Sequence, residues 1–305
     1  MNKKRILIVG GTGFIGYHLA KKCLKLKWEV TSVSTKSPKK IRKLENVKYL
    51  LLDISKNKDI ANKLSYNYDY VVNLAGYVDH SHNIKTMRSH YNGCKNLALH
   101  FLNSKIKKFV QIGSSIEYGR VNSPQVENNK NNQRTYSVYG KAKLLSTKFL
   151  QNLYKEKNFP AIIIRLYLVY GPYQDINRII PITIQNSIEN KKFNCSNGKQ
   201  LRDFIYVDDV ISAIIIILKK NEKNILGEII NIGSGKPVSV KSVILKICKL
   251  VGSGNPQFGK IKLRKDETHK LYPDITKAKK ILNWKITTNL SDGLIKCIKY
   301  FKRNK

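Results

Sequence analysis

The sequence has little of several features on which whole classes of protein depend. It has five cysteines among 305 residues, widely spaced and without a C-x-x-C pair, which argues against a disulfide framework and a zinc site. Its longest apolar run, AIIIIL at 213–218, is too short to cross a membrane. Glycines interrupt the apolar segment near the start, so we expect no secretory signal. These absences predict a globular cytoplasmic protein without a metal site or a membrane anchor.

Acidic residues are also scarce, since 20 Asp and Glu stand against 57 Lys and Arg and give a formal charge of +37. Such a charge raises the question of nucleic-acid binding. The lysines, however, are spread along the whole chain, and no long basic block is interleaved with aromatic residues. Abundant Lys, Asn and Ile together fit an AT-rich genome. The composition therefore disfavours a nucleic-acid partner, although the positive field would attract an anionic substrate.

Over the first two thirds of the chain, short β-branched runs alternate with longer amphipathic stretches. The pattern predicts strands at 5–10, 29–34, 47–53, 70–76, 108–114 and 161–167, and helices near 14–26, 56–64, 83–104 and 139–156. Strands that alternate with helices of this length predict a parallel sheet covered on both faces. The expected fold class is α/β, a Rossmann-type doubly wound parallel sheet.

After about residue 170 the rhythm changes to helices separated by short strands. Helices are predicted near 181–190, 207–220, 239–251 and 290–302. We expect a dinucleotide-binding domain over 1–170 and a smaller C-terminal substrate-binding lobe over 171–305. Some of its elements, such as 205–220, are expected to pack back on the first domain.

The motif GGTGFIG lies between the first predicted strand and the first predicted helix. Gly10 allows the tight turn, Gly13 lets the backbone approach a pyrophosphate, and Gly16 allows close helix–strand packing. The helix N-terminus, with Phe14 and Ile15, offers free N–H groups to phosphate. This context predicts dinucleotide binding.

The second predicted strand lacks the acidic residue that binds the adenosine ribose of NAD. Ser34, Thr35 and Lys36 occupy that region. Thr35 and Lys36 suit a 2′-phosphate, so the residues leave NADP open beside NAD.

Two further strand ends are predicted to contact the cofactor. Asp53, followed by Ile54, ends the third strand where an adenine contact would lie. Leu74, Ala75 and Gly76 end the fourth strand at the edge of the cofactor.

The stretch SVYGKAK places Tyr139 one helical turn before Lys143. Chance alone would produce two or three Tyr-x-x-x-Lys pairs in so lysine-rich a chain. There are three, namely Tyr17/Lys21, Tyr91/Lys95 and Tyr139/Lys143. The spacing therefore proves nothing by itself, and the surroundings of each pair must decide.

Only the third pair has a suitable partner at a strand end. The strand at 108–114 delivers Ser114 to the carboxyl edge of the sheet, where ligands bind in open α/β folds. Tyr139 and Lys143 share one face of the next helix because they are four residues apart. The three residues form a candidate catalytic set.

These residues belong to a series of motifs that spans nearly the whole chain. In order they read GGTGFIG, NLAG, GSSIEYG, YGKAK, RLYLVYGP, LRDFIYVDDV and NIGSG. The series resembles the extended short-chain dehydrogenases/reductases that modify nucleotide sugars. The resemblance implies NAD as cofactor, a nucleotide-diphosphate sugar as substrate, and a homodimer formed through the helices at 83–104 and 139–156.

The resemblance also implies a mechanism. A free tyrosine has a pKa near 10, and the Lys143 ammonium with a positive nicotinamide ring would favour the phenolate. Tyr139 then takes a proton from a sugar hydroxyl or returns it to a ketone, while Ser114 hydrogen-bonds the reacting oxygen and a hydride passes to or from the nicotinamide. Tyr139, Lys143 and Tyr167 are also expected to contact the cofactor.

By resemblance, the second lobe binds the nucleotide diphosphate. Arg202 is expected to contact phosphate, and the segment 170–181 to wrap the sugar nucleotide, with Arg178 as a further contact. An ion pair between Arg202 and Asp203 or Asp208 is the alternative.

Departures from the family pattern narrow the reaction. Dehydratases carry a Thr-Asp-Glu run where this chain has Ser114, Ser115 and Ile116, and Glu117 is one position out of register. Dehydration is therefore disfavoured, and the two serines are predicted substrate contacts. Enzymes that epimerise C3 and C5 carry Cys in place of Ile116 and His where this chain has Tyr173, so that reaction is disfavoured too.

Two more positions differ from many members. Leu168 replaces an Asn that contacts the nucleotide phosphate, and His90 replaces an Asn on the helix after the fourth strand. We interpret His90 as a packed or hydrogen-bonded helix residue rather than a catalytic one.

With dehydration and 3,5-epimerisation disfavoured, the remaining reaction of this family is hydride transfer at one sugar carbon, which we expect to be C4. The first hypothesis is an NAD(P)-dependent 4-dehydrogenase or 4-ketoreductase, such as one acting on a GDP-linked heptose in capsule polysaccharide biosynthesis. The second is a nucleotide-sugar 4-epimerase with tightly bound NAD. A catalytically silent dinucleotide-binding scaffold or RNA-binding protein is the alternative of another class.

Overall fold

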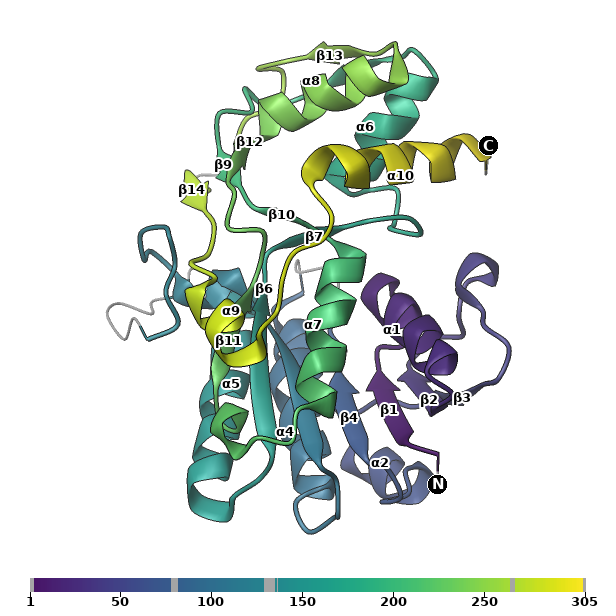
Figure 1. Ribbon diagram of the computed structural model, residues 1–305, viewed down its shortest axis with the longest axis vertical. Coiled ribbons are helices and arrows are strands. Elements are labelled where there is room, and N and C mark those ends of the chain that lie inside the picture. The colour runs from purple at the N-terminus through teal and green to yellow at the C-terminus, as the bar shows by residue number, and fades with distance from the viewer. Residues whose placement is uncertain (1–2, 78–81, 129–134, 136, 264–266, 304–305) are drawn as a thin grey trace.

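A seven-stranded parallel sheet organises the lower half of the molecule in Figure 1. This computed structural model describes residues 3–77, 82–128, 135, 137–263 and 267–303. The strands lie in the order β11-β6-β5-β4-β1-β2-β3. Their bounds are β1 Arg5–Val9, β2 Glu29–Ser34, β3 Val47–Leu51, β4 Tyr70–Asn73, β5 Lys108–Ser114, β6 Ala161–Leu166 and β11 Ile229–Ile232. The strand order reverses between β1 and β4, which opens a crevice at their carboxyl ends.

Except for the edge strand β3, the strands bury side chains on both faces of the sheet, which explains the nearly continuous apolar runs in the sequence. Ile6 and Ile8 of β1 join one core cluster, and Leu7 and Val9 join the other, because successive side chains point to opposite faces. The first cluster packs beneath α1 (Phe14–Lys25), α7 (Val207–Lys219) and α9 (Thr276–Leu282). The second packs beneath α2 (Asn57–Lys63), α4 (Gly93–His100) and α5 (Val138–Lys157).

The predicted doubly wound parallel sheet is therefore confirmed, with two differences from the predicted elements. The helix expected over 83–104 is divided into α3 (Asn83–Met87), a π-helical segment η2 (Arg88–Asn92) and α4. The short run IINI forms β11 and adds a seventh strand beside β6. α7 packs against α1 and β5, whereas β10 (Phe204–Tyr206), just before it, pairs with β7 (Leu168–Tyr170) in a separate sheet.

The upper part of Figure 1 holds smaller elements around α6, α8 and α10. The helices are α6 Ile179–Ile188, α8 Val240–Val251 and α10 Leu290–Arg303. The strands are β7 Leu168–Tyr170, β8 Lys192–Asn194, β9 Leu201–Arg202, β10 Phe204–Tyr206, β12 Val238–Ser239, β13 Asn255–Gln257 and β14 Lys270–Leu271. In the part of the chain that the structure describes there are also three short 3-10 segments, η1 Lys40–Arg42, η3 Ser115–Tyr118 and η4 Lys223–Ile225. Within the described ranges, no helix has the length and apolar character needed to span a membrane.

Candidate active site

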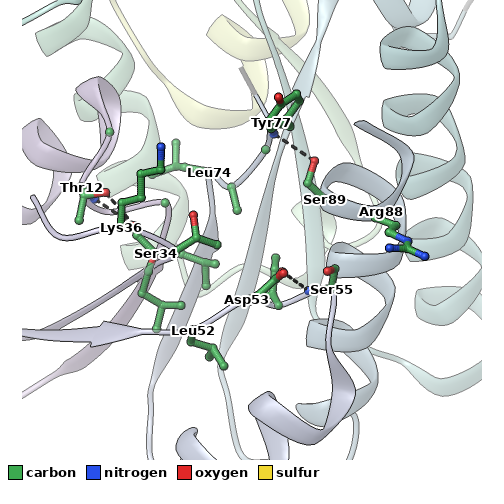
Figure 2. Close-up of a pocket in the computed structure, with 18 of the residues that line it drawn as sticks. Thr12, Ser34, Lys36, Leu52, Asp53, Ser55, Leu74, Tyr77, Arg88 and Ser89 are labelled. Carbon is green, nitrogen blue, oxygen red and sulfur yellow. Dashed lines mark hydrogen bonds between the residues drawn. The ribbon is translucent and has the colours of Figure 1, made fainter. Parts of the chain in front are cut away.

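A cavity of about 780 Å³ lies at the carboxyl ends of β1 to β4 (Figure 2). Ten of the predicted cofactor residues line it, namely Gly10, Gly13, Ser34, Thr35, Lys36, Asp53, Ile54, Leu74, Ala75 and Gly76. Other lining residues were not predicted from the sequence, among them Thr12, Ser55, Lys56, Tyr77, Lys85, Arg88 and Ser89. Most of these belong to the loop after β3 and to α3 and η2, where no motif marks them. The cavity is large enough for a sizeable ligand.

The glycine motif shapes the floor of this cavity. Gly10 has a φ of +82°, and a Cβ there would lie 2.9 Å from the Ala75 nitrogen. A Cβ on Gly16 would lie 2.4 Å from the Gly10 oxygen, so α1 can approach β1 only with glycine there. Gly13 is the N-cap of α1, and in the described chain no side chain caps that helix. The first N–H groups of α1, at Phe14 and Ile15, thus lie where an anion is stabilised.

The carboxyl end of β2 contributes no carboxylate to the residues that line the cavity, where the adenosine ribose of NAD would lie. The Ser34 hydroxyl donates to the Val33 oxygen at 2.7 Å and accepts from the Thr12 hydroxyl at 2.9 Å. Thr35 and Lys36 beside it are exposed. Asp53 supplies a carboxylate from the next loop, and its Oδ1 accepts from the Ser55 N–H at 2.9 Å (Figure 2). The glycine motif Gly10–Gly16, which forms a cradle for phosphate, the N-terminus of α1 and the cavity together fit a dinucleotide.

The three predicted catalytic residues converge beside this cavity. α5 begins after Ser137, whose hydroxyl accepts from the Gly140 N–H at 3.1 Å. Lys143 is 4% exposed, and its Nζ donates a 2.6 Å hydrogen bond to the Ile112 oxygen of β5. Ser114 ends the same strand. Its side chain is hydrogen-bonded with that of Tyr139.

Burial controls the protonation of this set. It raises the pKa of Tyr139, and the hydrogen bond with Ser114 and the charge of Arg178 oppose that rise. Burial lowers the pKa of Lys143 to about 8. In the protein alone, Tyr139 is therefore a neutral phenol. The lowering of its pKa towards neutrality, expected from Lys143 and a nicotinamide ring, stays a prediction for the complex.

The other two Tyr-x-x-x-Lys pairs have different surroundings. Tyr17 is 4% exposed and packs against Tyr173 in an aromatic cluster, with its ring centroid 4.6 Å away. Tyr91 and Lys95 lie on the outer surface formed by η2 and α4, beside Asn92 and Asn96. Neither pair lies beside Ser114.

His90 is a packed residue, as interpreted from the sequence. It is 5% exposed, and its ring meets the Tyr139 ring edge-on with a centroid distance of 4.9 Å. Its Nε2 is 3.2 Å from the Tyr77 oxygen. A Cβ on Gly76 would lie 1.8 Å from the His90 ring, so only glycine at position 76 leaves room for this histidine.

The two arginines predicted to bind substrate lie in different surroundings. Arg178 is exposed at the N-terminus of α6, and its charge reaches Tyr139. Arg202 is 6% exposed, donates to the Leu201 oxygen at 2.7 Å and forms an ion pair with Glu267. An ion pair was the predicted alternative for Arg202, but its partner is Glu267 and neither Asp203 nor Asp208.

The structure also describes the surroundings of two further predicted contacts, Ser115 and Tyr167, and of Leu168. Ser115 is buried in η3 directly after Ser114, and Leu168 is 39% exposed on β7. Tyr167 is buried, and its hydroxyl donates to Gln125 Oε1 at 2.8 Å. Tyr167, Tyr139 and Lys143 lie outside the residues that line the cavity.

One further contact joins the two halves of the molecule. The Arg42 side chain of η1 is buried and donates from Nε to the Tyr173 main-chain oxygen at 2.9 Å. Its Nη2 lies 3.1 Å from Asp175 Oδ1. The segment that precedes Arg178 is thereby attached to the loop after β2.

Comparisons with known proteins agree with this geometry. A dTDP-D-glucose 4,6-dehydratase of Dictyostelium discoideum is 30% identical over 81% of this chain but only 62% of its own length. An uncharacterized UDP-glucose epimerase of Bacillus subtilis, YtcB, is 30% identical over 97% of each chain. A solved mutant of UDP-glucuronic acid 4-epimerase from Bacillus cereus, in complex with UDP-4-deoxy-4-fluoro-glucuronic acid and NAD, is 28% identical, with a TM-score of 0.89 and coverage of 99% of this chain and 100% of that one.

Fold and site together define a dinucleotide-binding Rossmann protein with a second lobe at the carboxyl edge of its sheet. The chain belongs to the NAD dependent epimerase/dehydratase family, whose sequence profile matches residues 6–233. Membership confirms the family predicted from the motifs, and it confirms NAD as the cofactor.

Proposed function

We propose that the protein is an oxidoreductase that transfers a hydride at C4 of a nucleotide-diphosphate sugar. One observation carries this proposal. Tyr139 and Ser114 are hydrogen-bonded at the carboxyl edge of the sheet, while Glu117, the nearest carboxylate on that segment, is 0% exposed. The hydroxyl groups of Tyr139 and Ser114 can thus exchange a proton and a hydrogen bond with a sugar oxygen. Elimination of water would need an accessible acid or base, and the segment 114–117 offers none.

In this mechanism the chain's own residues handle the proton. When bound, NAD supplies the hydride acceptor and donor. The Gly10–Gly16 cradle and the cavity residues would hold it, and the Tyr139 oxygen takes the proton of the C4 hydroxyl or returns it. Ser114 donates a hydrogen bond to the reacting oxygen, and the Lys143 ammonium, fixed by the Ile112 oxygen, favours the phenolate of Tyr139.

Substrate binding falls to the second lobe in this proposal. Ser114 and Ser115 face the sugar, and Arg178 and Arg202 contact the diphosphate. The ion pair between Arg202 and Glu267 would then compete with the substrate for the same guanidinium group.

Net dehydrogenation or reduction, as on a GDP-linked heptose, is the first form of this activity. A 4-epimerase with tightly bound NAD is the second candidate. Two proteins that are similar over nearly the full length of the chain favour the epimerase. YtcB is named a UDP-glucose epimerase, and the Bacillus cereus enzyme is named a UDP-glucuronic acid 4-epimerase.

Two lesser proposals accompany the activity. Free thiols at Cys23, Cys94, Cys195, Cys248 and Cys297 fit a reducing compartment, so we place the enzyme in the cytoplasm. We also propose a homodimer through α3, α4 and α5, which light scattering of the purified protein would test.

The proposed activity is tested with purified protein and a panel of nucleotide sugars. Suitable members are UDP-glucose, UDP-glucuronic acid, UDP-N-acetylglucosamine, GDP-mannose and a GDP-heptose. Mass spectrometry of ligands released on denaturation should first identify NAD. A C4-keto product with free NADH indicates a net dehydrogenase, whereas interconversion of two C4 epimers without free NADH indicates an epimerase. No C4 change in any member by NMR, with NAD bound, would refute the proposal.

A further inference from the structure

A fully buried ion pair lies next to the catalytic set. Glu117 of η3 and Arg165 of β6 are both 0% exposed, and Arg165 Nε donates to Glu117 Oε2 at 3.0 Å. Two charges removed from water are tolerated only when good geometry and further hydrogen bonds compensate for the lost hydration. The partners of this pair therefore show what it holds in place.

Glu117 connects three elements of the site. Its Oε1 accepts the Ser114 N–H at 2.7 Å, and its Oε2 accepts the Thr147 hydroxyl at 2.7 Å. Thr147 follows Lys143 by four residues on α5, and Lys143 follows Tyr139 by four, so the three side chains form one stripe of the helix. Glu117 thereby fixes the end of β5 against the stripe that carries the proton-transfer residues.

The surrounding residues make room for this carboxylate. A Cβ on Gly113 would lie 2.5 Å from Glu117 Oε1 and 3.2 Å from Arg165 Cγ. Any other residue at position 113 would push the carboxylate away from Ser114. The Arg165 guanidinium also lies over the Tyr118 ring, 4.2 Å from its centroid, which fixes the arginine on its other side.

We propose that Glu117 is a positioning residue for the proton transfer at C4. It holds the Ser114 backbone and the Tyr139–Lys143 stripe in place, and its buried negative charge keeps the Lys143 ammonium protonated. The inference rests on the proposed function, because it assigns the proton transfer to Tyr139.

The electrostatics give this proposal a measurable consequence. Burial lowers the pKa of Lys143 to about 8, and the Glu117 charge opposes that fall. Burial raises the pKa of Tyr139, and the Glu117 charge contributes to that rise. Replacing Glu117 with a neutral residue should therefore lower both pKa values. The other titratable or charged groups that face this region are Cys94 on α4, His90 on η2, Tyr118 on η3, Arg165 and Tyr167 on or after β6, and Arg178 before α6.

The main test compares the pH dependence of kcat in the wild type and Glu117→Gln. Glutamine keeps the shape but removes the charge, so both limbs of the profile should move to lower pH by about one unit. Thr147→Val is the matched control, because it removes one hydrogen bond of Glu117 and leaves the charge. Its kcat should fall severalfold while its profile stays in place. A lower kcat for Glu117→Gln with both limbs unmoved would indicate a purely structural role and overturn the proposal.

If Glu117→Gln does not fold because Arg165 is left unpaired, the double variant Glu117→Gln/Arg165→Met removes both charges. The shift should then keep its direction but be smaller, because the loss of the Arg165 charge partly opposes it. A second measurement follows the ionisation of Tyr139 without turnover. The absorbance near 295 nm is titrated with pH for the wild type and for Glu117→Gln, and the curve of the same protein carrying Tyr139→Phe is subtracted. The pH at the midpoint of the difference should be lower in Glu117→Gln than in the wild type. Failure of the proposed function would abolish turnover in the wild type but leave this titration readable, whereas an unmoved midpoint would overturn the inference alone.

Discussion

The Nζ atom of Lys143 lies 2.6 Å from the carbonyl oxygen of Ile112, to which it donates a hydrogen bond. Ile112 is two residues before Ser114 on β5, so this bond fixes the register between α5 and the strand that carries the serine. It also places a positive charge where water has been excluded. Both consequences are measurable.

Lys143→Met should stabilise the protein while abolishing its activity. The pKa of the Lys143 ammonium falls to about 8 because burial penalises its charge, a cost of about 3 kcal/mol, part of which is recovered through the hydrogen bond to Ile112. At pH 7, where the lysine is charged in the folded and unfolded states, we expect the variant to be more stable by about 1–2 kcal/mol.

The difference in stability between Lys143→Met and the wild type should depend on pH. Between pH 8 and about 10.5 the unfolded wild type binds more protons than the folded protein, so its stability rises with pH. The advantage of Lys143→Met should therefore shrink across this window. Urea unfolding at pH 7, 8, 9 and 10 measures it, and an advantage that stays constant with pH would contradict a buried charged lysine.

Tyr139→Phe should lower kcat by about 10²–10⁴-fold, because it removes the group that transfers the proton. Its thermal midpoint should stay close to that of the wild type, since the ring and its contact with His90 remain. Tyr91→Phe is the matched control, as Tyr91 also precedes a lysine by four residues but lies on the outer surface. Equal losses of kcat in the two variants would refute the assignment of Tyr139.

Gly13→Ala should weaken NAD binding by about tenfold or more with little effect on folding. A Cβ there lies 3.2 Å from the Gly10 oxygen, a contact that a small shift relieves, and the residue has an ordinary φ of −77°. The methyl group would nevertheless occupy the space into which a pyrophosphate must come. Calorimetric titration with NAD measures the loss.

Gly16→Ala provides the contrast, because its Cβ would lie 2.4 Å from the Gly10 oxygen and 2.6 Å from the Gly11 Cα. That variant should lose thermal stability as well as NAD binding. If Gly13→Ala bound NAD as the wild type does, the cradle would not be the pyrophosphate site.

Arg202→Ala should weaken the binding of UDP or GDP by about tenfold or more, as a charged contact to the diphosphate is lost. Arg202→Lys should bind with intermediate affinity, since a lysine keeps the charge but not the bidentate geometry. Glu267→Gln removes the carboxylate that pairs with Arg202, so the nucleotide should bind severalfold more tightly. Nucleotide affinity that is unchanged in Arg202→Ala would show that Arg202 serves only its ion pair with Glu267.

The sheet and its crossover helices were predictable because their signals are local. β5 begins and ends at the predicted residues 108–114, and α5 covers Val138–Lys157 where a helix over 139–156 was expected. In both, apolar residues recur with one clear period. The division of the 83–104 helix by η2 was not predictable, because a π-helical segment leaves no mark on that period.

The role of Glu117 could be anticipated only in part. Arg165 stands in the apolar run AIIIRLY, and a charge in the middle of a buried strand requires a counter-ion. The sequence therefore contained the signal for a buried carboxylate. It could not show which of the 20 acidic residues fills that place, since Glu117 and Arg165 meet only when β5 and β6 pair.

The attachment of Arg42 to the main-chain oxygen of Tyr173 has a consequence for how this protein tolerates change. The hydrogen bond itself uses a carbonyl that every residue type presents. Tyr173, however, has a φ of +67° and packs its ring against Tyr17 and Tyr300, so a substitution there must adopt a left-handed backbone conformation and loses the aromatic contacts. The arginine is also constrained, because a shorter or neutral side chain would lose the carbonyl and Asp175 together. Neither side of this junction is therefore free to diversify.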